Sequence, residues 1–296
     1  MKHINRIKSL HRAALVLKCF SPEQVEFSVA EIAQRLGIHR TTAYRIMMTL
    51  MEEGLLQRDE KTEKYTIGPI LYALGSLYLS TTDIIKAAGP VIKILNELTG
   101  EAVNLGILNK GNVIFILKEE TKHAVHGPRP LGAIIPAYGS AMGKAMLSEL
   151  DEETLDRIYP DENLIPTTEK TIKTKTELKK ELKEIKKTGV SIDREGSWIG
   201  IEGIGSVIRD ATGMVIAATS ISGPIYRITD TLRAQWSALV KLGASLISYR
   251  LGYQDEGNPV RNIEEIRNWW RQNIMDSASQ VSEATEPSSP RYGTTE

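Results

Sequence analysis

The chain has 296 residues, of which 25% are charged, and a formal net charge of zero, so its overall charge indicates neither a nucleic-acid nor a membrane partner. Its single cysteine, Cys19, excludes an internal disulfide and a cysteine-rich metal site, as is typical of a protein in a reducing cytoplasm. Because there is no apolar signal region and no run of 18 apolar residues, we expect a soluble, cytoplasmic protein.

The N-terminal segment is more basic than the rest of the chain. Residues 1–50 carry eight lysines and arginines against three acidic residues, which is the charge pattern expected of a nucleic-acid-binding module. Apolar residues at helical spacing predict a first helix over residues 9–19. Arg12 on this helix either contacts phosphate or simply faces solvent.

Residues 28–50 predict two helices separated by a glycine. Ser28 and Glu31 form a capping box at the start of the first helix, and Gly37 supplies the left-handed conformation that ends it. In the second helix, Ala43, Met47 and their apolar neighbours form an inward face. The outward face carries the expected DNA contacts Arg40, Thr41, Thr42, Tyr44 and Arg45.

The next segment predicts a hairpin. The sequences LLQRD and KYTIG read as two short strands joined by a polar turn, with Arg58, Lys61 and Lys64 placed to contact phosphate or the minor groove. Three helices and a hairpin predict a winged helix-turn-helix domain over residues 1–68. The alternative is an ordinary helical hairpin in an α domain.

The order of these motifs resembles a known family. SLHRAALVLKCF, VAEIAQRLGIHRTTAYRIMMTLMEEGLLQ and KYTIGPILYALG are similar to the N-terminal domain of the IclR family of bacterial transcription regulators. The match extends over about residues 9–252. It places Thr41, Thr42 and Arg45 at the positions where the family's reading helix carries Ser or Thr, Thr and Arg.

The segment GPILYALGSLYL is apolar on nearly every side, so it needs a partner beyond its own domain. The resemblance implies that residues 69–82 are the linker helix through which family members form homodimers, and in some cases dimers of dimers. The alternative is a core helix of the second domain. A helix capped by Thr82 or Asp83 follows, and Pro90 is expected to begin or kink the next one.

Residues 83–253 predict a second domain of the α+β class. Strands at residues 101–108 and 112–119 are separated by a hairpin signal, and further strands precede Pro136 and cover the stretches GIGSVIRD and GMVIAATSIS. Helices at both ends of these strands indicate one antiparallel sheet. The resemblance implies a GAF-like effector-binding domain. In the extension of residues 254–296, a helix is expected from Asn262 to Met275 with Trp269 and Trp270 exposed or docked, and disorder is expected from Ser277.

Catalytic and metal motifs are weak in this chain. GSAMGKA is one residue too short for a P-loop and ends in Ala145 where a Ser or Thr is needed. His123 and His126 lack the further ligands of a zinc site. We therefore expect no catalytic residue, no metal and no cofactor.

An effector site is better supported. A helix that begins near Ser140 offers backbone N–H groups to an anion. The resemblance implies that Ala141 and Met142 offer N–H groups to a carboxylate or carbonyl, that Asp193, Ser220 and Ser222 supply polar contacts, and that Ile135 and Ile201 are apolar walls. Gly203 stands where some family members have a cysteine, and Met142 is bulkier than the usual alanine.

The sequence therefore predicts a dimeric regulator that represses or activates a catabolic operon. It would bind a palindromic operator in double-stranded DNA under the control of a small organic effector, a carboxylate by expectation. The alternatives are a ligand-independent DNA-binding protein and a metabolite-binding enzyme with a DNA-binding domain.

Overall fold

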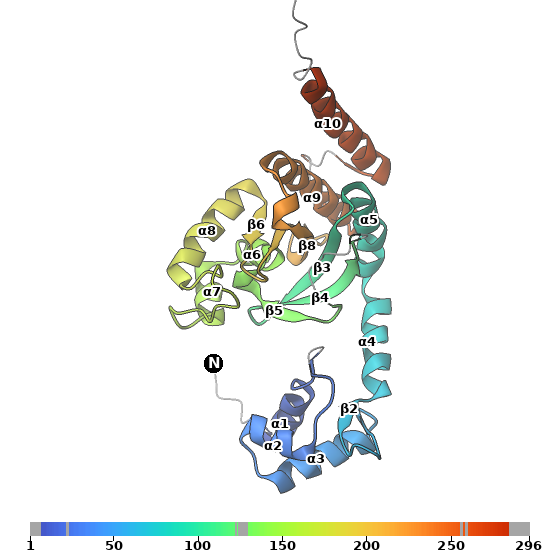
Figure 1. Cartoon of the computed structure of the whole chain (residues 1–296), viewed down its shortest axis with the longest axis vertical. Helices are drawn as coiled ribbons and strands as arrows, with labels where there is room; N and C mark the ends of the chain where they lie inside the picture. The colour runs from blue at the N-terminus through green and yellow to red at the C-terminus, as the bar shows by residue number, and fades with distance from the viewer. Residues whose placement is uncertain are drawn as a thin grey trace, which may run out of the picture. The chain divides into compact units, whose positions relative to one another are not determined.

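The computed structural model describes residues 7–21, 24–121, 123, 130–254, 257 and 260–283, apart from the side chains of residues 79–81 and 275–283. The chain divides into two compact units, Met1–Asp83 and Ile84–Glu296, and most of their elements are labelled in Figure 1. No helix in the described part of the chain has the length and apolar character needed to cross a membrane.

The N-terminal unit combines a small helical core with a two-stranded hairpin. Its elements are α1 (Lys8–Leu17), α2 (Val29–Leu36), α3 (Arg40–Glu52), β1 (Leu56–Arg58), β2 (Tyr65–Ile67) and α4 (Pro69–Thr81). Phe27, Ile32, Met47 and Tyr65 are buried in one core that the helices share with the hairpin. The predicted winged helix-turn-helix architecture is confirmed.

The turn between α2 and α3 has the caps predicted from the sequence. Ser28 Oγ accepts the N–H of Glu31 at 3.3 Å, and the Glu31 carboxylate accepts the N–H of Ser28 at 2.7 Å, which completes a capping box. Gly37 ends α2 with a left-handed φ of 61°. The cap of α3 was not predicted: His39 Nδ1 accepts the N–H of Thr41 at 3.3 Å.

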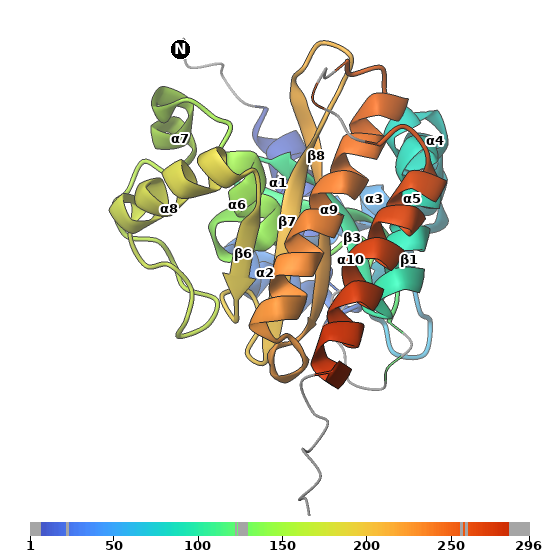
Figure 2. The same cartoon turned by 90° about the horizontal axis from the view of Figure 1, so that it is seen from above.

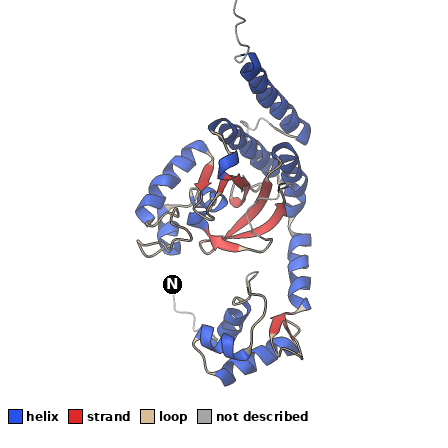
Figure 3. Ribbon diagram, viewed as in Figure 1, coloured by secondary structure: helices blue, strands red, loops and turns tan. Residues whose placement is uncertain are grey.

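The C-terminal unit is built on one antiparallel sheet (Figure 3), in which the described residues form six strands in the order β5-β4-β3-β8-β7-β6. The strands are β3 (Ala102–Asn109), β4 (Asn112–Glu119), β5 (Ile134–Pro136), β6 (Ser191–Arg194), β7 (Ile201–Arg209) and β8 (Val215–Pro224). The helices are α5 (Asp83–Thr99), α6 (Ala141–Leu147), α7 (Glu152–Ile158), α8 (Lys175–Thr188), α9 (Asp230–Arg250) and α10 (Ile263–Glu283). Short 3-10 turns occur at η1 (Ala137–Gly139) and η2 (Ile225–Arg227). The predicted α+β, GAF-like domain is confirmed.

Helices cover both faces of this sheet. On one face, α5 and α9 pack over Val103, Ile204 and Ile221, and α10 lies beside them (Figure 2). On the other face, α6, α7 and α8 pack over Val113 and Phe115. Because side chains alternate along each strand, this second face also receives the polar side chains of the candidate site.

One expected helix boundary is wrong. α5 runs without a break from Asp83 to Thr99 with Pro90 inside it, so no separate helix begins at Pro90. Ala87 and Ala88 before the proline and Val91 after it are all buried against the sheet. Their packing holds one continuous helix despite the hydrogen bond that a proline removes.

The C-terminal extension also differs from expectation. α10 continues to Glu283, so the helix end expected at Met275 is wrong; the added stretch has neither proline nor glycine to end the helix. The disorder expected from Ser277 stays a prediction. Residues 284–296 lie outside the described part of the chain. Trp269 and Trp270 are half-buried and pack against the core that α5 and α9 form, which means that they are docked.

Replacing Ile266 by valine is expected to lower the free energy of unfolding of the C-terminal unit by about 1 kcal/mol. Ile266 is fully buried and ties α10 to the core. Calorimetric unfolding of the full chain measures the change, and Asn268→Ala on the exposed side of α10 is the matched control. Equal stability of the two variants would show that α10 does not pack on the domain in solution.

Candidate functional site

α3 presents the predicted DNA contacts on its open face. Ala43, Met47 and Leu50 are buried in the core of the unit. On the other side, Arg40, Thr41, Tyr44 and Arg45 are exposed and Thr42 is half-buried. The local fold therefore leaves hydroxyl and guanidinium groups available for a groove of DNA, as a reading helix requires.

Arg12 lies on the same surface as the reading helix. A groove of about 600 Å³ runs between α1 and α3, and Arg12, Thr42 and Arg45 all line it. Two guanidinium groups beside one groove create a local positive potential that attracts phosphate. This placement favours phosphate contact by Arg12 over a solvent-facing role.

The predicted contacts on the hairpin differ from one another. Arg58 donates to Glu63 at 2.8 Å, and Lys64 donates to Glu26 at 2.5 Å, a hydrogen bond that raises the pKa of the Lys64 ammonium. The acidic partners offset much of the positive charge of Arg58 and Lys64, which weakens the attraction of these two groups for phosphate. Lys61 is exposed at the tip of the hairpin, so we expect it to contact DNA more readily than Arg58 or Lys64.

The residues predicted for the effector site surround one cavity in the C-terminal unit. The cavity has a volume of about 50 Å³, more than one water molecule needs. The predicted residues that line it are Ile135, Ala141, Met142, Asp193, Ile201, Gly203, Ser220 and Ser222. They come from β5, α6, β6, β7 and β8, so the fold brings distant parts of the sequence together.

Cross-strand pairing builds the floor of this cavity. Ser222 pairs with Ala102 on one side and with Gly203 on the other, while Ser220 pairs with Asn104 and Gly205. A side chain at position 203 would be in ordinary contact with Ala141, 3.5 Å away. The absence of a side chain on Gly203 therefore contributes space to the cavity.

α6 lies close to the chain that precedes it. A Cβ atom on Gly143 would be only 2.1 Å from the carbonyl oxygen of Ala137, so glycine is required there. Ser140 Oγ accepts the N–H of Gly143 at 3.1 Å and caps the helix. The N–H groups of Ala141 and Met142 have no acceptor within the helix, and their use by an effector stays a prediction.

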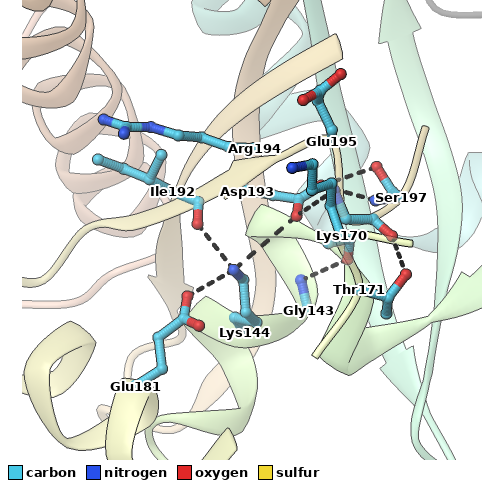
Figure 4. A network of polar contacts seen from close by, with 12 residues as sticks. Gly143, Lys144, Lys170, Thr171, Glu181, Ile192, Asp193, Arg194, Glu195 and Ser197 are labelled. Carbon is cyan, nitrogen blue, oxygen red and sulfur yellow. Dashed lines mark hydrogen bonds and ion pairs between the residues drawn. The ribbon is translucent and has the colours of Figure 1, made fainter. Parts of the chain in front are cut away.

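Asp193 joins the cavity wall to a polar network (Figure 4). Its carboxylate accepts the N–H of Gly196 at 3.1 Å, and the N–H and hydroxyl of Ser197 at 3.1 and 2.9 Å. Burial raises the pKa of the Asp193 carboxyl, and the Lys144 ammonium at 4.0 Å opposes this shift. Asp193 thus shapes the loop beside the cavity in addition to the contact role predicted for it.

Lys144 holds three elements together. Its ammonium donates to Glu181 on α8 at 2.6 Å and to the Ile192 carbonyl on β6 at 2.8 Å. These partners account for the lysine of GSAMGKA by packing and charge pairing. In the part of the chain that the structure describes, no three His, Cys, Asp or Glu side chains are grouped to hold a metal; His123 is exposed and His126 lies outside that part.

Several residues that line the cavity are not predicted from the sequence. They are Ala102, Asn104, Phe115, Lys118, Ser140, Ser197 and Trp198. Asn104 and Lys118 face each other on β3 and β4. The signal for Asn104 and Lys118 is a polar residue within an otherwise apolar run, EAVNLGIL or NVIFILKE. The sequence does not show that they face the cavity, because the face on which each residue lies depends on the strand register.

Comparisons with known proteins agree with this architecture. A model of the IclR helix-turn-helix domain matches residues 9–60, and a model of the bacterial transcriptional regulator IclR C-terminal domain matches residues 76–249. The HTH-type transcriptional repressor AllR of Escherichia coli K12 is 31% identical over 245 residues, which are 83% of this chain and 90% of AllR.

Two solved structures extend the comparison. The crystal structure of the Thermotoga maritima IclR has a TM-score of 0.63 and 30% identity, covering 84% of this chain and 100% of that one. An IclR homologue of Microbacterium hydrocarbonoxydans complexed with 4-hydroxybenzoate has a TM-score of 0.69 and 22% identity, covering 82% of this chain and 98% of that one. At this identity the comparison shows a similar fold alone. The chain belongs to the IclR family of bacterial transcriptional regulators.

Proposed function

We propose that this regulator binds double-stranded DNA through α3 and that a small organic acid bound on the sheet controls the binding. The cavity carries the proposal, because residues from five elements meet around it and include every residue predicted for an effector site. The ligand of the Microbacterium homologue, a carboxylic acid, supports an acid as the effector class. AllR is a repressor by name, and we take repression as the mode of action.

The operator is proposed to be a palindrome read by a homodimer in the cytoplasm. Ile70, Tyr72 and Leu74 on α4 are exposed to 44%, 80% and 54%. Apolar side chains exposed to this extent along one helix favour a protein partner. A two-fold dimer through α4 would present two copies of α3 to two half-sites, and pairing of dimers would extend the assembly.

Control by the effector requires unequal binding to two conformations of the protein. An acid that binds more tightly to the conformation with low operator affinity releases DNA, and one that prefers the other conformation promotes binding. The coupling is reciprocal, so operator DNA changes the affinity for the acid by the same factor.

Two other functions make different predictions. A ligand-independent DNA-binding protein would fill the site with its own side chains, so the cavity beside Ile135, Asp193 and Ser222 supports control by a ligand instead. An enzyme would need a nucleophile with a base. Ser197 does donate to Asp193, but this carboxylate already accepts two backbone N–H groups, so we favour binding over turnover.

Genomic footprinting followed by a thermal-shift screen tests the proposal. We expect the full chain to protect a small set of palindromic sites, and an organic acid from the pathway encoded beside them to raise the unfolding temperature. Arg45→Ala is the control: this variant should protect the same sites less than the wild type does. Protection by this variant equal to that of the wild type, or no stabilising acid in the screen, would overturn the assignment.

A further inference from the structure

The cavity has a second polar end, away from Asp193. Its charged lining residues are Asp193 on β6 and Lys118 on β4, and the sheet order separates these two strands by three others. Asn104 on β3 is the cross-strand partner of Lys118. Asn104 and Lys118 are therefore direct cross-strand neighbours that both line the β4 end of the cavity.

A β-bulge places Lys118 on the cavity side of the sheet. The register between β3 and β4 shifts so that Phe115 pairs with Gly106 but Leu117 pairs with Leu105. Ile116 is the extra residue, and it packs with Leu117 on the α5 and α9 side. Strict alternation from Phe115 would point Lys118 to that apolar side, so the bulge is what brings its charge to the cavity.

The amide of Asn104 has an acceptor to which no described residue donates. Asn104 is 4% exposed, and its Nδ2 donates to Ser222 Oγ at 3.0 Å. Its Oδ1 is buried and has no hydrogen-bond partner among the residues that the structure describes. A buried acceptor left unpaired destabilises the unliganded state, so a ligand that donates to it gains the corresponding free energy.

The Lys118 ammonium is suited to a carboxylate. Its side chain is 7% exposed, and it pairs at 2.9 Å with Glu120, which is 61% exposed. Around a mostly buried ammonium, solvent screens charge less than in bulk water, so the attraction between the ammonium and a ligand carboxylate is stronger there. Lysine has three donors, so a ligand carboxylate can share the ammonium with Glu120.

We propose that the effector is a compact carboxylic acid with a hydroxyl or N–H group close to its carboxylate. Lys118 binds the carboxylate, and Asn104 Oδ1 accepts the hydrogen bond from the second group. The cavity volume of about 50 Å³ suits a molecule of a few heavy atoms. This inference rests on the proposed function, in which the cavity is the effector site.

Four three-carbon probes test both contacts on the full-length wild type. Lactate has a carboxylate and a hydroxyl donor beside it. Pyruvate has the carboxylate with a keto acceptor in place of the hydroxyl, and propionate has the carboxylate with neither group. Lactamide keeps the hydroxyl but has a neutral amide in place of the carboxylate. Titrations followed by tryptophan fluorescence, to which Trp198 beside the cavity contributes, give the four affinities. We expect lactate to bind roughly tenfold more tightly than each of the other three.

Two variants assign each preference to its residue. In Asn104→Leu the preference for lactate over propionate and pyruvate should vanish, while the preference over lactamide remains. In Lys118→Met the preference for lactate over lactamide should vanish, while the preference over propionate and pyruvate remains. Lys118→Arg keeps the positive charge and should bind lactate more tightly than Lys118→Met does. Lys187→Met, which removes an exposed lysine of α8, is the matched control and should bind all four probes like the wild type.

The outcomes separate this inference from the proposed function. Propionate or pyruvate binding as tightly as lactate overturns the donor contact, and lactamide binding as tightly as lactate overturns the charge contact. An acid from the thermal-shift screen whose affinity is unchanged in both variants overturns the subsite and leaves the proposed function standing. Failure of every acid to bind the wild type overturns both.

Discussion

Replacing Arg233 by alanine is expected to lower the free energy of unfolding of the effector domain by about 3–5 kcal/mol. Glu202 on β7 is completely buried. The guanidinium of Arg233 on α9 donates to both of its carboxylate oxygens, to the second at 3.1 Å, and also to the Ile228 carbonyl. Removing the arginine leaves a buried carboxylate without its main partner, which is the costly way to break such a pair.

Two further variants identify the cause of the loss. Arg194 lies 3.7 Å from Glu202 and its side chain is 56% exposed, so Arg194→Ala should change stability far less. Replacing the pair together, by Glu202→Leu and Arg233→Met, should recover most of the lost stability because no unpaired charge remains. Urea unfolding followed by the fluorescence of the buried Trp236 provides the measurement. Equal, small effects of Arg233→Ala and Arg194→Ala would contradict the role of the pair.

Replacing Arg45 by alanine is expected to weaken specific operator binding by about 1–3 kcal/mol if the guanidinium reads a base edge. Arg45 is exposed one turn into α3 and borders the groove that Arg12 also lines. If Arg45 reads a base, the loss should concentrate at one position of each half-site. Fluorescence anisotropy with operator fragments that differ at single base pairs measures this pattern.

Comparison with Arg12→Ala separates base reading from phosphate contact. A phosphate contact should weaken binding to all sequences alike and reduce the salt dependence of the affinity. Arg157→Ala on α7, whose side chain is 61% exposed, controls for the loss of one positive charge elsewhere. Unchanged operator affinity of Arg45→Ala would refute its role as a reading residue.

The local elements could be predicted because their signals are local. Ser28, Glu31 and Gly37 specify the ends of α2 through contacts within a few residues. The turn between β3 and β4 needs positive φ at two positions, and Lys110 and Gly111 adopt 49° and 81°. The reading helix and the antiparallel domain followed from such signals together with the resemblance.

The remainder of the site depends on tertiary pairing. Lys118 belongs to an apolar run, and only the bulge at Ile116 decides that it faces the cavity. Asn104 reads as a single polar residue in a strand until its partner Ser222, 118 residues away, is known. The structure differs from the expected helix boundaries at Pro90 and at the end of α10, because local helix signals compete there with packing and with the absence of a terminating residue.

Operator affinity measured with and without a bound acid tests the central claim most directly. The operator from footprinting is titrated with the full chain, alone and with a saturating concentration of the acid that most stabilises it. We predict a change in operator affinity of about fivefold or more, absent when the acid no longer binds because Lys118 and Asn104 are replaced. The same operator affinity in both titrations would contradict control of DNA binding from the cavity.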